Sequence, residues 1–94
     1  MEYRQKLVEY LLATARQNAS DLHLAVGRRP TLRIDSVLTP MIKEPILTKE
    51  DTEGLAMAML TDDQKDKFSK LKQIDLSYNL EDKARFRVNV YYQR

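Results

Sequence analysis

The sequence contains no cysteine and no tryptophan, a single histidine, and only two glycines among its 94 residues. Without cysteine the chain cannot form a disulfide or offer a thiolate to a metal, and this composition is typical of proteins that work in a reducing cytoplasm. No apolar run approaches the ~20 residues that a membrane-spanning helix needs, and the amphipathic start carries charges throughout, unlike a signal peptide. We therefore expect a cytoplasmic domain that does not insert into a membrane.

The scarcity of glycine excludes one large class of enzymes. The two glycines are Gly27 and Gly54, and no G-x-x-x-x-G-K-[ST] pattern occurs. A phosphate-binding loop needs glycines where backbone N–H groups converge on the anion, followed by a lysine. The chain by itself is therefore expected not to be a P-loop enzyme and to carry no cofactor.

Charge of neither sign dominates. Lysine and arginine number 16 against 14 aspartates and glutamates, which gives a net charge of +2. This balance offers no support for a nucleic acid or an anionic membrane as partner. Apolar residues make up 43% and charged residues 32% of the sequence, ordinary values for a globular protein. A chain of this length predicts one small domain with a modest core.

The spacing of apolar residues changes along the chain from helical to strand-like and back. Periods of 3.6 residues predict helices, and alternation predicts strands. Thr48 and Thr61 each begin a capping pattern, and Pro45 favours a loop at 41–47. The resulting order is a helix at 3–18, strands at 21–26, 31–35 and 37–38, a helix at 48–60, a short helix from Thr61 through Leu71, and a hairpin of strands at 74–78 and 85–90.

Strands at both ends of the chain favour an α+β fold: an antiparallel sheet of five or six strands with helices packed on its apolar face. Alternation then assigns Leu24, Ile34, Leu76, Phe86 and Val88 to the core. The opposite face is expected to carry Asp21, His23, Arg33, Asp35, Asp75, Ser77, Arg85, Arg87 and Asn89.

Few of these residues suggest chemistry. His23 with Asp21 and Asp35 offers two carboxylates and one imidazole to a metal, a weak pattern next to the simpler interpretation of a strand histidine bonded to a carboxylate. The serines that could act as nucleophiles have no signature around them: Ser20, Ser36 and Ser77. We therefore predict no catalytic residue and no metal site.

The segment 85–92 alternates arginines with aromatic and aliphatic residues, as a strand of an RNA-recognition motif does. That motif needs small residues between its aromatics, whereas this segment has Arg87 and Asn89 there. Two interpretations stay open: a half-buried strand with solvated arginines, which the pattern alone favours, or arginines that bind phosphate oxygens.

Three separated motifs stand out along the chain. They are Ala19-Ser20-Asp21-Leu22-His23-Leu24 followed by Gly27, Pro30, Arg33 and Asp35; Thr61-Asp62-x-Gln64 with Ile74-Asp75-Leu76-Ser77-Tyr78; and Ala84-Arg85-Phe86-Arg87-Val88-Asn89. In this order they resemble the secretion and pilus ATPases, and the short leader and the residues after His23 are similar to the retraction (PilT-type, twitching-motility) branch. The one departure is Ser36, where the family usually has glycine.

This resemblance implies that residues 1–94 are a PAS-like amino-terminal domain, with a RecA-like ATPase domain to follow in the parent protein. Such parents use ATP and Mg²⁺, form homo-hexamers, and act with the pilus machinery at the inner membrane, not on nucleic acid. The domain would pack on the ATPase domain of its own and a neighbouring subunit and couple ATP state to domain rotation.

The resemblance also implies roles for single residues. Arg85, Arg87 and Arg94 would approach the nucleotide phosphates of a neighbouring subunit. The remaining polar residues of the first motif would hold the sheet and the contact between domains: Asp21, His23, Arg33 and Asp35. The alternative is a free-standing PAS-like sensor of a small ligand, but apolar residues fill the positions between sheet and helices, and no polar cluster predicts a pocket there.

Overall fold

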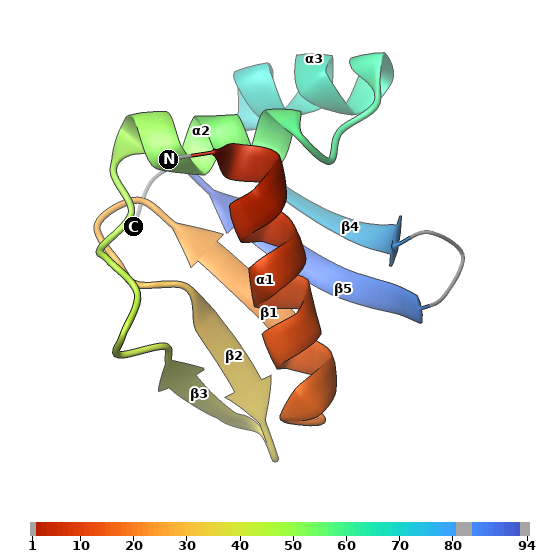
Figure 1. Ribbon diagram of the computed structural model, residues 1–94. Coiled ribbons are helices and arrows are strands. Elements are labelled where there is room, and N and C mark those ends of the chain that lie inside the picture. The colour runs from red at the N-terminus through yellow and green to blue at the C-terminus, as the bar shows by residue number, and fades with distance from the viewer. Residues whose placement is uncertain (1, 81–83, 93–94) are drawn as a thin grey trace.

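A computed structural model describes residues 2–80 and 84–92 (Figure 1). The predicted elements are all present, with boundaries shifted by a few residues; the first helix, for example, ends before Asn18, whose φ of 55° lies in the left-handed region. The elements are α1 (Tyr3–Arg16), β1 (Asp21–Ala25), β2 (Thr31–Ile34), β3 (Val37–Pro40), α2 (Lys49–Met57), α3 (Asp62–Leu71), β4 (Gln73–Leu80) and β5 (Ala84–Tyr91).

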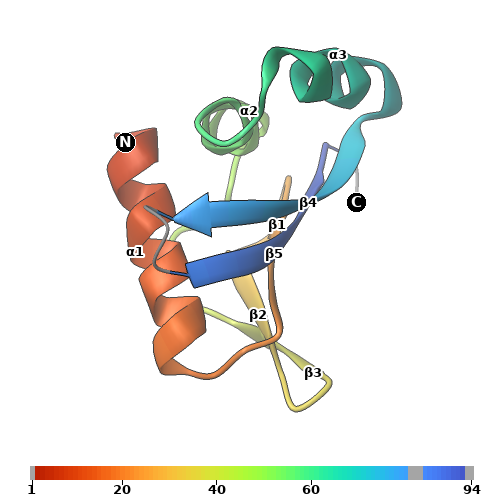
Figure 2. The same cartoon turned by 90° about the vertical axis from the view of Figure 1, so that its right-hand side faces the viewer.

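The strands form one five-stranded sheet in the order β3-β2-β1-β5-β4. Helices pack against one face of this sheet, which confirms the α+β class. Within the described residues no helix covers the other face, as Figure 2 shows. The sheet is mixed, however, because β1 and β5 pair in parallel while the other pairs are antiparallel. Hairpins dictate the antiparallel pairs. No hairpin joins β1 to β5, because three strands and two helices lie between them in the chain.

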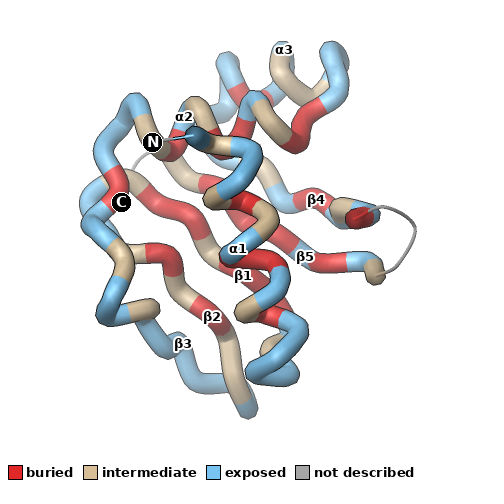
Figure 3. Tube along the Cα trace, in the orientation of Figure 1, coloured by how far each residue is buried: buried red, intermediate tan, exposed pale blue. Residues whose placement is uncertain are grey.

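The core lies between α1, α2 and the covered face of the sheet. Leu7, Tyr10 and Leu11 of α1 are almost fully buried against Leu22 and Leu24 of β1. Figure 3 shows this burial along β1 and β5, while β3 at the edge is exposed. Four of the five residues predicted in the core are buried, namely Leu24, Leu76, Phe86 and Val88. Ile34 is half-buried because it ends β2 beside the exposed strand β3.

Two capping boxes begin α2 and α3 as predicted. In each, a threonine side chain accepts a hydrogen bond from the third helical N–H, and that residue's side chain bonds back to the threonine N–H. Thr48 pairs with Asp51 in this way, and Thr61 with Gln64. Such boxes satisfy backbone N–H groups that the helix leaves free, typically ~1 kcal/mol each.

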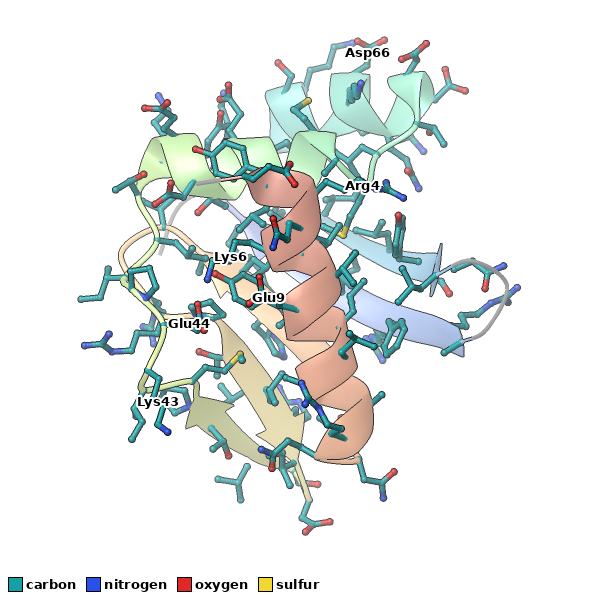
Figure 4. The ribbon with its side chains drawn as sticks, viewed as in Figure 1. Arg4, Lys6, Glu9, Lys43, Glu44 and Asp66 are labelled. Carbon is teal, nitrogen blue, oxygen red and sulfur yellow. The ribbon has the colours of Figure 1, made fainter. Side chains whose placement is uncertain are left out.

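The loop between β3 and α2 is tied to both α1 and the turn after β1. Lys6 Nζ lies 3.4 Å from Glu44 Oε1 and 3.8 Å from Glu9 Oε1, and Figure 4 shows the three side chains side by side. Gly27 N–H donates to the Leu47 carbonyl at 2.8 Å, and Leu47 N–H donates to the Arg28 carbonyl at 2.9 Å. The φ of 83° at Gly27 favours glycine there.

Candidate functional site on the helix-free face

Strand register brings the predicted polar residues of β1, β2 and β5 together. Asp21 lies opposite Arg33 on β2 and opposite Arg87 on β5. One step along, His23 lies opposite Asn89 of β5, which in turn lies opposite Asp75 of β4. We call this group the polar face: Asp21, His23, Arg33, Asp75, Arg87 and Asn89. It surrounds a hollow of about 460 Å³.

Asp21 is the centre of the polar face. Its carboxylate accepts hydrogen bonds from Ser20 Oγ at 2.6 Å and from Asn89 Nδ2 at 3.2 Å. His23 Nε2 lies 2.5 Å from Asp21 Oδ2, and Arg33 Nε lies 3.5 Å from the same oxygen. Asp21 and Asn89 are buried, although no helix in the described part of the chain covers them. The simple interpretation of His23 as the partner of a carboxylate is therefore confirmed.

The environment of Asp21 favours its charged form. Burial raises the pKa of this carboxyl, but the hydrogen bond from Ser20, the charge and hydrogen bond of His23, and the charge of Arg33 together lower it more, so the pKa lies below its ordinary value. A negative charge therefore stays between His23 and Arg33 at neutral pH. It fixes the orientation of both side chains and partly neutralises Arg33.

His23 connects the two ends of this face. Its Nδ1 lies 3.5 Å from Asn89 Nδ2. Its ring stacks on Tyr91 of β5, with centroids 6.4 Å apart and planes 4° from parallel. These contacts leave the imidazole little freedom to rotate. The described residues contain no group of three aspartate, glutamate, histidine or cysteine side chains placed to hold a metal ion, and Asp35 lies away from His23.

Arg85 and Arg87 leave the sheet on this face, two residues apart on β5, and both are exposed. Arg85 lies opposite Asn79, and Arg87 lies between Asp21 and Ser77. Among the described residues, neither guanidinium makes a hydrogen bond or an ion pair. The prediction that both arginines lie on the same face of the sheet is confirmed, and both are available to an outside group.

Two of the predicted site residues do not join this group. Asp35 is in the β2–β3 turn, where it and Ser36 have φ of 50° and 69°; two left-handed residues in succession are what a tight hairpin requires. The turn carries Asp35 beyond the end of β2, past Arg33. Arg94 lies outside the described residues.

Alternation along β5 predicts Asn89 on this face, but it does not predict the buried contact of Asn89 with Asp21 or the stacking of Tyr91 on His23. Asn89 and Tyr91 are two residues apart on one strand, and this spacing was the available signal that both side chains lie on the same face.

Among the residues that the structure describes, none of the helices has the length and apolar character of a membrane span.

The comparison with known proteins agrees with this picture over nearly the whole chain. No family model matches it. The chain is 34% identical over 87 residues to the type IV pilus retraction ATPase PilT of Pseudomonas aeruginosa, covering 93% of this chain and 25% of PilT. It is 26% identical over 78 residues to the type IV pilus ATPase PilU of the same organism, covering 83% of this chain and 20% of PilU.

A solved structure shares the fold. A crystal structure of the pilus retraction motor PilT with bound ADP matches with a TM-score of 0.73 and 36% identity, over 92% of this chain and 25% of that one. The chain thus spans about a quarter of the length of the relatives that it matches. Sequence and fold together identify it as a member of the PilT-type pilus retraction ATPase family, corresponding to the amino-terminal domain of these proteins.

Proposed function

We propose that this chain is the coupling domain of a hexameric type IV pilus retraction motor. Residues 1–94 form one domain that precedes an ATPase domain in the parent protein, and the helix-free face packs on the ATPase domain of its own or a neighbouring subunit. The observation that carries this proposal is the pair Arg85 and Arg87: both are exposed on one sheet face and, within the described residues, without an internal partner.

The chemistry of two such arginines suits nucleotide phosphates. Residues two apart on a strand are separated by about 7 Å and point to the same side, so both side chains can reach one polyphosphate. Guanidinium groups bind phosphate oxygens through paired hydrogen bonds. In phosphoryl transfer an arginine that meets the developing charge is worth ~10³ or more in rate. Arg94 is proposed as a third, weaker contact.

The polar network around Asp21 gives this face a defined shape. Asp21, His23 and Arg33 are held by hydrogen bonds and ion pairs and present the centre of the contact between domains, while Asp35 is placed at the hairpin tip beside it. A rigid face transmits the position of one domain to the next better than a mobile one, which is what coupling requires.

The parent protein in this proposal is a homo-hexameric motor that hydrolyses ATP with Mg²⁺ in the cytoplasm and acts with the pilus machinery at the inner membrane. The relatives' own names support the ATP-hydrolysing retraction motor in this proposal, since they are a retraction ATPase and a retraction motor with bound ADP. The present chain has no P-loop motif and is proposed to contribute to catalysis only through its arginines.

The experiment is steady-state ATP hydrolysis by the assembled parent carrying Arg85→Ala or Arg87→Ala. Arg16→Ala is the matched control, since Arg16 is also an exposed arginine but lies in the last turn of α1. We expect kcat to fall about tenfold or more in the β5 variants while nucleotide affinity changes less than about threefold, because the arginines act mainly in the transition state.

Thermal melting checks that the variants fold, and lysine at either position should rescue poorly because it lacks the planar fork. Wild-type turnover in both β5 variants would overturn the catalytic role and leave these arginines as solvated residues of the sheet.

A further inference from the structure

A second hollow lies on the helix-free face beyond the polar face, towards β3. Its volume is about 510 Å³, and its charged lining consists of Arg28 and Arg29 from the β1–β2 turn and Arg33 from β2. None of the described residues that line it is an aspartate or a glutamate. We call it the arginine pocket. Arg85 and Arg87 do not line it, so substitutions of those two arginines leave its lining unchanged, whereas Arg33 is shared with the proposed contact between domains.

The positive charges of this pocket are poorly neutralised. Arg29 Nη1 donates to the main-chain carbonyl of Glu44 at 2.6 Å, a contact that orients the guanidinium but leaves its net charge. Arg28 is exposed and forms no ion pair within the described part of the chain. Arg33 shares the single charge of Asp21 with His23, at 3.5 Å. Within the described residues, at least two of the three guanidiniums therefore have no carboxylate that neutralises them and are available to an outside anion.

The backbone that carries these arginines is held firmly. The Arg28 carbonyl accepts the hydrogen bond from Leu47, which is buried, and Thr31 Oγ1 donates to the Arg29 carbonyl at 2.8 Å. The arginines therefore start from fixed main-chain positions, which reduces the entropy lost when they bind a partner.

The remaining walls are apolar and aromatic. Tyr91, stacked on His23, forms one side, and Leu38 and Pro40 of the edge strand β3 form another. Leu38 is 49% exposed and its neighbour Val37 62% exposed. Arginine and tyrosine beside an apolar strip are the residues that most often dominate binding at protein interfaces.

We infer that the arginine pocket binds an acidic segment of a partner protein, an extended stretch whose carboxylates flank an apolar or aromatic side chain. The guanidiniums match carboxylates in charge and in bidentate geometry, and Leu38, Pro40 and Tyr91 match the apolar side chain. A nucleic acid fits less well, because Leu38 and Pro40 make part of the wall apolar and the net charge of the chain is only +2, whereas a phosphate chain is bound by an extended row of basic residues.

The test uses the 94-residue chain and a fluorescein-labelled peptide of one phenylalanine flanked by pairs of glutamates. Fluorescence anisotropy at low salt should give a saturable Kd below about 1 mM, which rises as added salt screens the charges. Arg28→Ala/Arg29→Ala should weaken binding by about tenfold or more. Arg29 also donates a hydrogen bond to the Glu44 carbonyl, so the double variant could disturb the loop. Arg28→Glu is a second variant that leaves this hydrogen bond intact, and thermal melting checks that both variants fold.

Three controls locate the site. Arg4→Ala/Arg16→Ala removes the same charge from α1, and Arg85→Ala/Arg87→Ala removes it from β5; each should change the Kd by less than about twofold. In NMR spectra the peptide should shift the amide signals of Thr31 and Leu38. The matched peptide with glutamines in place of glutamates should not bind.

Any of four results would overturn the inference. The first is that the glutamate peptide shows no saturable binding up to about 1 mM. The second is that the glutamine peptide binds equally well, and the third is that the α1 control loses as much affinity as the pocket variants. The fourth is that pyrophosphate binds saturably at these arginines and the glutamate peptide does not displace it, which would indicate a site for small anions.

Discussion

Asn89 Nδ2 donates a hydrogen bond to Asp21 Oδ2 at 3.2 Å, joining two buried polar side chains that lie 68 residues apart. The bond crosses the parallel junction of β1 and β5, where no hairpin sets the register. A carboxylate buried with several donors is costly to leave unsatisfied, so any slip of β5 along β1 breaks the network. This pair therefore helps to specify how the two ends of the chain meet.

Asp21→Asn should destabilise the domain by roughly 1–3 kcal/mol at neutral pH. The amide keeps one acceptor oxygen and replaces the other with an N–H₂ group, which faces either the Ser20 hydroxyl on the Oδ1 side or Asn89 and Arg33 on the Oδ2 side, so at least one donor loses its acceptor. Asp75→Asn is the control, because Asp75 lies on the same face but is exposed, and should change stability by less than about 0.5 kcal/mol. Urea unfolding measures both. Equal stability of the two variants would contradict the central role of Asp21.

The wild type and Asp21→Asn should also differ in their pH dependence. The pKa of Asp21 is lowered in the folded protein from its ordinary 3.8, so the unfolded state binds more protons in this range. Its stabilising contribution is complete above pH 3.8 and is lost as the pH falls through the folded value. The free energy of unfolding should thus decline more steeply below about pH 5 in the wild type than in Asp21→Asn.

Asp51 is the second carboxyl to consider in that experiment. Burial raises its pKa, but hydrogen bonds from Thr48 and Tyr3 lower it more. It is unchanged in both proteins, so the difference between their pH profiles reports Asp21. Parallel profiles would show that the Asp21 network adds nothing to the acid sensitivity of the fold.

Much of this architecture could be predicted from local patterns. Alternation in β5 separates Phe86 and Val88 from Arg85 and Arg87, and the structure confirms both faces. The threonine capping patterns place the starts of α2 and α3. These features depend on residues a few positions apart, which is why a single sequence is enough to infer them.

What could not be predicted depends on residues distant in the chain. The parallel direction of β1 against β5 follows from the path of the crossover, which no local pattern records. The burial of Asp21 and Asn89 follows from their pairing, not from their type. Arg28 and Arg29 meet Tyr91 only once the turn and β5 are placed together.

Gly54→Ala should destabilise the domain by roughly 1–3 kcal/mol, although alanine favours a helix by about 1 kcal/mol over glycine. Gly54 is in α2, and a Cβ there would overlap the ring of Tyr3 in α1. Relieving the overlap moves Tyr3 and breaks its hydrogen bond to Asp51, 3.2 Å long. Thermal or urea unfolding measures the loss.

A double variant separates this overlap from other effects of the new methyl group. In a Tyr3→Ala background the obstacle is gone, so Gly54→Ala should become neutral or stabilising by up to about 1 kcal/mol. An equal loss in both backgrounds would show that the contact with Tyr3 is not the reason for glycine at this position.

The isolated 94-residue chain should neither hydrolyse ATP nor bind it with a Kd tighter than about 1 mM. It has no P-loop motif, and two exposed arginines alone do not surround a triphosphate. Isothermal titration calorimetry with ATP and Mg²⁺ is the measurement. A Kd in the low micromolar range would contradict this and would favour a small-ligand sensor over a coupling domain.

Mixing inactive variants of the parent shows which subunit the β5 arginines serve, provided that the proposed function holds. Subunits carrying Arg87→Ala are mixed with subunits whose P-loop lysine is replaced, each preparation being nearly inactive alone. If Arg87 acts on a neighbour's nucleotide, mixed rings contain sites that join an intact P-loop to an intact arginine. Random assembly of equal amounts creates such sites at about a quarter of the positions in a head-to-tail ring.

ATPase activity should therefore recover on mixing, up to about a quarter of the wild-type rate if sites act independently. If Arg87 instead served its own subunit, every subunit would lack one of the two groups and mixing would restore nothing. Energy transfer between labelled subunits verifies that the subunits exchange. As a control, Arg16→Ala subunits, in which Arg87 is intact, are mixed with the lysine variant. This mixture measures how far subunits with an inactive P-loop lower the ATPase activity of a ring. Verified mixed rings without recovery would place the arginine and the nucleotide in the same subunit.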